Sequence, residues 1–435
     1  SSVAIDLDKS MAQLELVCGN FVYQTKPMGG RTNVGFQSVV NMNSIAGVEK
    51  FYPKRLDDQS EYGYTTYSGT SVADIDADGN LDVFLTGAKT SFSGATTVFW
   101  WDYDAGTVKT FSPPDDNGPY GVDGWLWGTS RLNLGEVDGK QKWLNPNTET
   151  QILDANFPLA NVAPDKDPGA DGDQYPLEIT FIAGSQLFCL DVNDATGELE
   201  EMWRRVLNDS KSGIVMNTIY DFNNDGLPEV VYRDSQQLVV VDGQTGADVK
   251  WAVTCQSHTM AEGPVVADVD GNGSTDICVA CNTSNSFDIT ADIQQQALGQ
   301  IRLYYSEENN WLPTRQVWNQ PGYFVVNVND DLTIPQNMVD LNISYGDTPC
   351  ANGIPGEVMP FNTFLNQVPT LGNDGCPIFP GPDIEFAGAD PSDPRLDPTD
   401  PLYDASVVPA IVVTPPTCGA TLFTVAFNIV NSGSL

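Results

Sequence analysis

Short apolar runs, each bounded by Gly, Pro, Asn or Asp, follow one another along most of the chain. Runs of strand length that are bounded by turn-forming residues predict β-strands. No long window keeps the apolar period near 3.6 residues that an amphipathic helix requires. The pattern therefore predicts an all-β protein that essentially lacks long helices.

The hairpin turns recur at a regular spacing. Apolar strands end in turn residues near positions 106, 148, 197 and 246, which are 42, 49 and 49 residues apart. A period in the forties with about four strands per repeat is typical of β-propeller blades. Six units contain such a hairpin, and strands around 323–328 can complete or close another. We therefore expect a β-propeller of about seven four-stranded blades over residues 1–344, with six or eight blades left open.

The composition changes after residue 344. Residues 345–405 are rich in Pro, Gly and Asp, and proline fixes an extended backbone, so this segment is expected to be a semi-rigid linker. Apolar runs at 407–413 and 421–430 predict the first strands of an immunoglobulin-like β-sandwich over residues 406–435. Because two strands cannot bury a sandwich core, this domain is incomplete and we expect the chain to be a piece of a longer protein.

An acidic pattern of nine residues occurs three times between apolar runs. Asp or Asn occupies positions one, three and five, Gly occupies position six, and Asp or Glu occupies position nine. Weaker relatives start at residues 6, 136 and 165. The candidate metal ligands are Asp74, Asp76, Asp78, Asn80 and Asp82 in the first copy, Asp221, Asn223, Asp225, Leu227 and Glu229 in the second, and Asp268, Asp270, Asn272, Ser274 and Asp276 in the third.

This spacing favours Ca²⁺ as the bound ion. Side chains at positions one, three and five point inward when the backbone curls around a cation, and Gly at position six allows a sharp turn. A carbonyl oxygen at position seven and the carboxylate at position nine complete a set of oxygen donors, which Ca²⁺ prefers. Polar Asx turns between strands are the structural alternative. Three copies of one pattern favour Ca²⁺, whereas the weaker copies are not assigned.

The charge balance excludes several classes of partner. The chain has 58 Asp and Glu against 20 Lys and Arg, a formal net charge of −38. Such a surface repels nucleic acid and anionic lipid, while it suits hard cations. No apolar run reaches the length of a membrane-spanning helix. We expect no nucleic-acid partner and no direct membrane insertion.

The residues needed for common catalytic sites are scarce. His258 is the single histidine, so no Ser-His-Asp or Cys-His arrangement is available, and the strongest carboxylate clusters are assigned to metal. We therefore expect that the protein is not an enzyme, with a calcium-dependent polysaccharide-active enzyme as the alternative. Tyr120, Trp125 and Trp127 lie in a Gly-rich stretch, where they can stack on sugar rings or belong to the core.

The eight cysteines predict no zinc site, because Cys278 and Cys281 lack a second Cys or His pair that would complete tetrahedral coordination. Cys350 and Cys376 flank a polar loop, and a disulfide between them is expected if the compartment is oxidising. Cys189 and Cys278 lie within apolar runs and are expected in the core.

The acidic repeats, over residues 1–320, resemble the FG-GAP/VCBS repeats of integrin-α-type propellers. Residues 315–335, which begin Arg-Gln-Val-Trp-Asn-Gln, resemble a stretch of large surface adhesins that gliding Bacteroidetes export by type IX secretion, and the C-terminal strands resemble a CARDB-like domain. The resemblance implies an extracellular, cell-surface module that binds a glycan or a surface ligand and contacts the type IX secretion machinery during export. A structural spacer of a large surface filament is the alternative.

Overall fold

The computed structural model describes most of the repeat region and short parts of the C-terminal segment. The described residues are 2–7, 14–27, 34–52, 54–56, 65–67, 70–76, 78–90, 96–114, 126–130, 142–143, 153–154, 177–183, 185–193, 196–208, 216–223, 228–247, 249–257, 263–282, 299–306, 311–335, 338–341, 361–370, 384–386, 411–414, 424–427 and 429–431.

Five antiparallel sheets dominate the described residues, four with four strands and one with three, and each strand is hydrogen-bonded to the next strand of its sheet in chain order. The first sheet contains β1 (Ser2–Ile5), β2 (Glu15–Cys18), β3 (Phe21–Pro27) and β4 (Val34–Asn41), and the second contains β7 (Thr70–Ala73), β8 (Asp82–Ala88), β9 (Thr96–Asp102) and β10 (Thr107–Phe111). The third contains β11 (Leu126–Ser130), β14 (Glu178–Ala183), β15 (Gln186–Asn193) and β16 (Glu198–Val206). The fourth contains β17 (Asn217–Tyr220), β18 (Glu229–Arg233), β19 (Gln237–Asp242) and β20 (Val249–Thr254), and the fifth contains β21 (Val265–Ala267), β22 (Asp276–Asn282) and β23 (Gly299–Tyr305).

The remaining described elements are short. The paired strands are β5 (Lys54–Leu56) with β6 (Thr65–Tyr67), β12 (Lys142–Trp143) with β13 (Leu153–Asp154), β24 (Ile384–Phe386) with β27 (Ile429–Asn431), and β25 (Ile411–Thr414) with β26 (Thr424–Phe427). Two 3₁₀-helices are η1 (Met42–Ser44) and η5 (Val325–Asn327). No helix among the described residues is long and apolar enough to cross a membrane.

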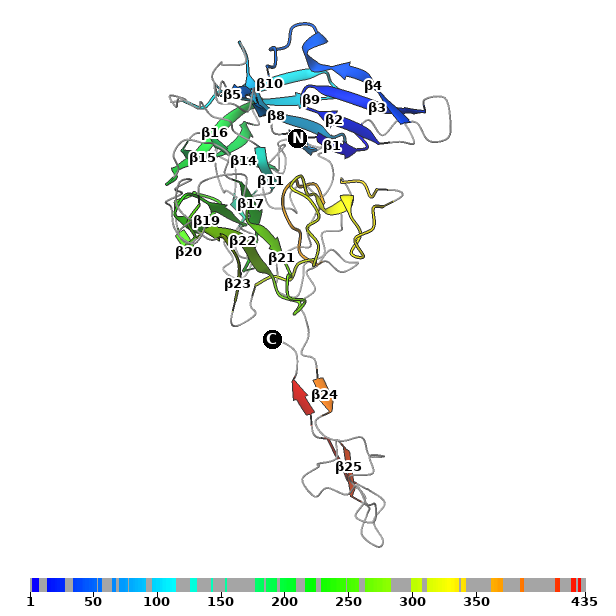
Figure 1. Cartoon of the computed structure of the whole chain (residues 1–435), viewed down its shortest axis with the longest axis vertical. Coiled ribbons are helices and arrows are strands. Elements are labelled where there is room, and N and C mark those ends of the chain that lie inside the picture. The colour runs from blue at the N-terminus through cyan, green and yellow to red at the C-terminus, as the bar shows by residue number, and fades with distance from the viewer. Residues whose placement is uncertain are drawn as a thin grey trace, which may run out of the picture.

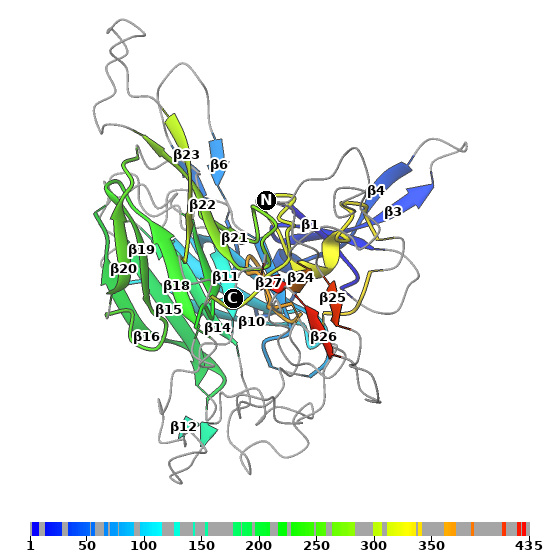
Figure 2. The ribbon, with the colours of Figure 1, turned by 90° about the horizontal axis from the view of Figure 1, so that it is seen from below.

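The five sheets follow one another around a common centre (Figures 1 and 2). Their first strands are neighbours in chain order, because β1 contacts β7, β7 contacts β11, β11 contacts β17, and β17 contacts β21. Each sheet runs outward from its first strand as an antiparallel meander. This is the arrangement of propeller blades, and the all-β prediction is confirmed.

Apolar side chains fill the space between successive sheets. One cluster joins Phe84 and Trp100 of the second sheet to Phe181 and Phe188 of the third, and equivalent clusters join the third to the fourth and the fourth to the fifth. A sheet buried on both faces requires apolar residues at successive positions, not alternating ones. This explains why the inner strands appear in the sequence as continuous apolar runs.

Residues 311–335 and 338–341, which we call the closing segment, lie between the fifth sheet and the first (yellow in Figure 1). Phe324 and Val325 of this segment pack in the same apolar cluster as Val3 and Val17 of the first sheet. At its other end, Leu312 packs in one apolar cluster with Val266 and Ile277 of the fifth sheet. The closing segment therefore contacts both ends of the series of sheets.

Residues 361–370, which we call the axial segment, contact the first strands of the sheets. The Thr218 Oγ1 of β17 donates to the Leu365 carbonyl at 2.7 Å, and Gln367 Nε2 donates to the Val266 carbonyl of β21 at 3.3 Å. The linker prediction for 345–405 did not anticipate this burial. The axial segment can be buried because Asn362 hydrogen-bonds to the backbone of Asp74 and Gln367 hydrogen-bonds to the backbone of Val266. These bonds replace the hydrogen bonds to water that the polar side chains lose.

The hairpin turns carry the expected glycines. Gly106, Gly197 and Gly246 have φ values of 67°, 65° and 63°, a region that L-residues rarely adopt. At Gly246 a Cβ atom would also come within 2.3 Å of the Trp203 ring, whose Nε1 donates to the Gly243 carbonyl at 2.8 Å. The turn expected near residue 148 lies outside the described residues.

One disulfide joins neighbouring sheets, between Cys255 after β20 and Cys281 on β22. It was not predicted, because its partners lie in separate strands that only the ring arrangement brings together. Cys189 is buried, as expected, and Cys278 is partly buried. Cys350 and Cys376 lie outside the described residues, so their pairing stays a prediction.

The number of blades and the boundaries at 344 and 405 also stay predictions. Among the described residues, five sheets have the form of a blade, and the closing segment occupies a further sector without forming a sheet of its own. The strand pairs β24–β27 and β25–β26 lie apart from the ring (Figure 1). β25, β26 and β27 lie where the strands of a partial immunoglobulin-like domain were expected, whereas β24 lies within the expected linker 345–405.

Candidate metal centre

The three acidic loops occupy the same place in three sheets, between the first strand and the second. In register, the last residue of the first strand faces the carboxylate residue at position nine. These pairs are Ala73 with Asp82, Tyr220 with Glu229, and Ala267 with Asp276. The strand pairing therefore fixes where each loop begins and ends, which places equivalent side chains at equivalent positions.

The loop 74–82 is curled around its own carboxylates. The Gly79 backbone N–H donates to Asp74 Oδ2 at 3.0 Å, and the Ile75 N–H donates to Asp82 Oδ2 at 2.9 Å. Gly79 has a φ of 94°, which allows the sharp turn expected at position six. Asp74 and Asp82 are both buried, so two carboxylates of this loop are shielded from solvent.

The loop 268–276 repeats this geometry. The Gly273 N–H donates to Asp268 Oδ2 at 3.1 Å, and the Val269 N–H donates to Asp276 Oδ2 at 2.8 Å. Gly273 has a φ of 85°. Because loops from different sheets adopt the same hydrogen bonds, the sequence pattern specifies one backbone conformation.

Positions three and five of the two loops also form the same hydrogen bond. The Asp78 N–H donates to Asp76 Oδ1 at 3.3 Å, and the equivalent Asn272 N–H donates to Asp270 Oδ1 at 3.1 Å. These are the Asx turns of the structural alternative, and they are present. A carboxylate oxygen that accepts one such hydrogen bond keeps a second lone pair, so the turns and a bound cation are compatible.

Two groups of carboxylates converge closely enough to hold a metal ion. In each group, one carboxylate oxygen per residue lies within 4.8 Å of the others. The groups are Asp74, Asp76 and Asp78, and Asp268, Asp270 and Asp276. All of these donors are oxygen atoms, the hard ligands that Ca²⁺ prefers and Zn²⁺ does not.

Asp276 provides the clearest sign that a ligand belongs in this loop. Its side chain is completely buried, and its Oδ1 atom has no hydrogen-bond partner among the described residues. A buried carboxylate oxygen without a partner is costly, because it has lost its hydration without compensation. A cation held with Asp268 and Asp270 would satisfy this oxygen, so the donor set fits Ca²⁺.

Burial and the closeness of several carboxylates raise the pKa values of three aspartates in these loops. Burial, followed by repulsion from Asp78, Asp102 and Asp104, raises the pKa of Asp76 to about 6. Burial, followed by repulsion from neighbouring aspartates, also raises the pKa of Asp82 and of Asp276. The raised pKa values mean that the ionised forms of these carboxyl groups are disfavoured, and a bound divalent cation would favour them.

The loop 221–229 is described only in part. The Phe222 N–H donates to Glu229 Oε2 at 3.1 Å, the same hydrogen bond that positions two and nine form in the other loops. Asp225 and Leu227 lie outside the described residues. The ligand assignment of this loop therefore stays a prediction, as do the individual ligands of the other two.

In two other sheets, a glutamate occupies the place that the carboxylate at position nine has in the acidic loops. Glu15 opens β2 opposite Ile5, and Glu178 opens β14 opposite Ser130, and both side chains are buried. The Leu7 N–H donates to Glu15 Oε2 at 3.1 Å, as in the complete loops. Sequence reasoning assigned neither residue. A signal was present, since each glutamate begins an apolar strand that follows a degenerate acidic stretch.

The closing and axial segments contact the first ligand position of two loops. Asn362 Oδ1 accepts the Asp74 N–H at 2.8 Å, and its Nδ2 donates to the Asp74 carbonyl at 2.7 Å. Gln316 Nε2 donates to Asp268 Oδ2 at 3.2 Å, and the Arg315 carbonyl accepts the Asp268 N–H at 3.1 Å. The acidic loops are thus bonded to the segments that complete the ring.

Comparison with known proteins identifies one repeat region. Residues 221–279 match the model of the FG-GAP-like repeat, so they contain two of the three acidic loops and the strands between them. The FG-GAP repeat implies propeller blades, in agreement with the ring of sheets. A comparison with curated proteins finds no match.

Solved structures show distant similarity. The Vibrio cholerae biofilm matrix protein Bap1 has a TM-score of 0.38 and 15% identity, over 88% of this chain and 71% of that chain. The exotype rhamnogalacturonan lyase YesX has a TM-score of 0.34 and 12% identity, over 72% and 48% of the respective chains. An Agrocybe aegerita lectin specific for non-reducing terminal N-acetylglucosamine has a TM-score of 0.32 and 13% identity, over 66% and 63%. Similarities of this size carry no information about function.

Proposed function

We propose that this chain is a calcium-stabilised β-propeller module of a secreted bacterial surface adhesin, that it binds a glycan or a surface ligand, and that it has no catalytic activity. The observation that carries the calcium part is the loop 268–276, in which Asp268, Asp270 and the buried, unpartnered Asp276 Oδ1 converge. Extracellular calcium modules of this kind bind with dissociation constants of about 10⁻⁴ to 10⁻³ M, which matches calcium levels outside cells.

The proposed role of the ion is structural. Calcium at the loops 74–82 and 268–276 would fix Asp74 and Asp268, which are bonded to Asn362 and Gln316. These contacts would transmit the stabilisation to the closing and axial segments. Calcium would therefore hold the ring together as well as its own loops.

The proposed location outside the cytosol is supported by the disulfide between Cys255 and Cys281, because disulfides persist in oxidising compartments. Export by the type IX secretion machinery and display on the cell surface are part of this proposal. They depend on the resemblance of residues 315–335 to exported adhesins.

Exhaustive chelation tests the calcium part. We expect the melting temperature to fall in chelator and to recover when Ca²⁺ is added, and titration calorimetry to detect binding at millimolar Ca²⁺. An unchanged melt together with the absence of calorimetric heat would refute a structural calcium site. Magnesium serves as the control ion, because its tight octahedral geometry suits these loops poorly.

A glycan array probed in calcium and in chelator tests the adhesion part. A binding module should show hits that are lost in chelator, whereas a structural spacer should show none. Incubation with mixed polysaccharides, followed by assays for new reducing ends and unsaturated products, tests the enzyme alternative. Reproducible turnover would contradict the proposed lack of catalytic activity.

A further inference from the structure

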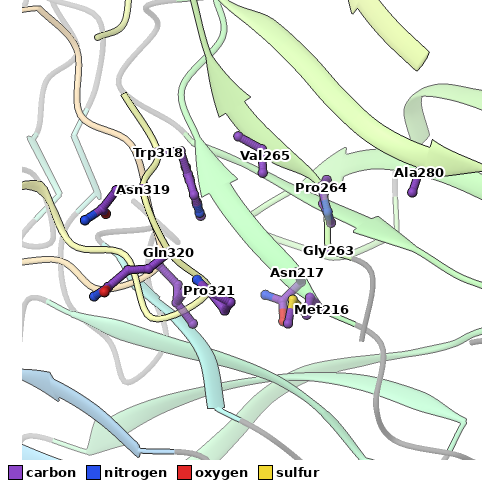
Figure 3. Close-up of a pocket in the computed structure, with 11 residues that line it drawn as sticks. Met216, Asn217, Gly263, Pro264, Val265, Ala280, Trp318, Asn319, Gln320 and Pro321 are labelled. Carbon is purple, nitrogen blue, oxygen red and sulfur yellow. The ribbon is translucent and has the colours of Figure 1, made fainter. Parts of the chain in front are cut away.

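A pocket of about 370 Å³ lies between the closing segment and the fourth and fifth sheets (Figure 3). It is lined at the starts of β17 and β21, by Asn217 and Val265. The acidic loops follow the other ends of these strands, after Tyr220 and Ala267. The pocket is therefore separate from the candidate metal centre.

The closing segment supplies one side of the pocket. This side consists of Trp318, Asn319, Gln320 and Pro321, while Gly263–Val265 and Ala280 of the fifth sheet lie across from it. Trp318 is partly buried, and its indole stacks on the buried ring of Tyr323 with a centroid distance of 4.6 Å. This stacking fixes the orientation of the indole before any ligand binds.

Leu365, which also lines the pocket, is held in place as well. Leu365 has a φ of 56°, which is strained for a leucine, and both of its backbone polar groups are bonded. Its N–H donates to the Tyr323 carbonyl at 2.9 Å, and its carbonyl accepts the Thr218 hydroxyl at 2.7 Å. A site whose walls are fixed in advance loses little conformational entropy when a ligand binds.

The chemistry of the lining is unusual for this chain. None of the residues that line the pocket carries a charge, although the chain has a formal net charge of −38. The lining instead contains the indole ring of Trp318 and the side-chain amides of Asn217, Asn319 and Gln320. Amides both donate and accept hydrogen bonds, as sugar hydroxyl groups require, and an aromatic face suits the C–H face of a sugar ring.

We propose that this pocket binds one unit of a neutral saccharide, with the sugar ring against Trp318 and its hydroxyl groups near the amides of Asn319 and Gln320. The volume lies at the lower end of the range of about 300–1,000 Å³ that is typical of ligand pockets, which favours a single unit. The uncharged lining disfavours acidic and basic sugars, since it would leave their charges uncompensated. This inference rests on the adhesion function proposed above and assigns a site to it.

The experiment uses the whole chain in millimolar calcium, labelled with 5-fluorotryptophan. Each of the nine tryptophans contributes one fluorine NMR signal, and the signal that disappears in Trp318→Phe identifies Trp318. The probes are neutral oligosaccharides, acidic oligosaccharides and a proline-rich peptide, each of which is also tested on an array. We expect neutral oligosaccharides to shift the Trp318 signal.

Two variants test the role of the pocket residues. We expect Trp318→Ala and Asn319→Ala each to weaken binding about tenfold. Asn319 is exposed, so its variant retains the fold even if Trp318→Ala does not, and calcium titration checks the fold of both. Gln236→Ala, which removes an exposed amide in the turn before β19, is the matched control and should bind like the unchanged chain.

The outcomes separate this inference from the adhesion function. Saccharide hits that leave the Trp318 signal unshifted and bind Asn319→Ala normally would overturn the pocket, while adhesion would stand. A shift caused only by the proline-rich peptide or by acidic sugars would overturn the assignment to neutral saccharides. The absence of binding to every saccharide probe would overturn both proposals.

Discussion

The substitution Asp76→Asn tests the calcium proposal, because its effect on stability should have opposite signs with and without calcium. In Asp76→Asn, the Oδ1 atom that accepts the Asp78 N–H is retained, but a negative charge and a carboxylate ligand are removed. Without calcium, the substitution removes the cost of burying a charged carboxylate and also its repulsion from Asp78, Asp102 and Asp104. With calcium, it removes part of the attraction for the ion. The same variant should therefore be more stable than the unchanged chain in chelator and less stable in calcium.

The magnitude follows from the pKa of about 6 for Asp76, which lies above the ordinary value of 3.8. A difference of this size corresponds to about 3 kcal/mol between the protonated and ionised forms, and partial exposure to solvent reduces this to about 1–2 kcal/mol. Because the folded-state pKa is raised, the folded protein binds more protons than the unfolded chain. The contribution of Asp76 to the free energy of unfolding is therefore fully present below about pH 4, and it is lost as the pH rises through about 6.

Thermal unfolding of both proteins across this pH range, in chelator and in calcium, measures the effect. In chelator above pH 6 or so, the variant should melt on the order of 2 °C higher, and below about pH 4 the difference should vanish. In calcium at neutral pH, the variant should melt lower. Glu49→Gln, which removes one charge from an exposed carboxylate, is the control. A variant that is destabilised under both conditions would refute the reasoning.

Three further predictions concern the ring and its loops. Breaking the disulfide with Cys255→Ser and Cys281→Ser should cost about 3.5 kcal/mol, from the 26-residue separation of its cysteines, and denaturant unfolding under non-reducing conditions measures this loss. Asn362→Ala should cost about 2–4 kcal/mol and weaken calcium binding, because the Asp74 backbone N–H and carbonyl lose their hydrogen bonds to Asn362, and equal calcium affinity would contradict the link. Replacing Asp74, Asp76 and Asp78 together with Ala should remove one calcium-binding event from the calorimetric titration and leave the other sites titratable.

The sequence was informative wherever a local rule determines the structure. Apolar runs predicted the strands, since a strand buried between two sheets needs apolar residues on both faces. The acidic pattern predicted the curled loops, because alternating carboxylates and a glycine at position six specify that backbone locally, as Gly79 and Gly273 show. Turn glycines such as Gly246 predicted the hairpins for the same reason.

Contacts between distant residues were decided only by the tertiary structure. The pairing of Cys255 with Cys281 depends on two sheets lying side by side, and no pattern along the chain encodes that distance. The burial of residues 361–370 was hidden by their Pro- and Gly-rich surroundings, because Asn362 meets Asp74 only once the ring has closed.

The pocket beside Trp318 likewise depends on three elements that are far apart in the sequence, β17, β21 and the closing segment. Each contributes residues that are ordinary on their own, and their shared uncharged lining exists only after folding. What the sequence by itself determined is the local unit, a strand, an acidic loop and a second strand. What the tertiary structure decided is how copies of that unit and the segments between them meet, because long-range packing depends on the whole ring.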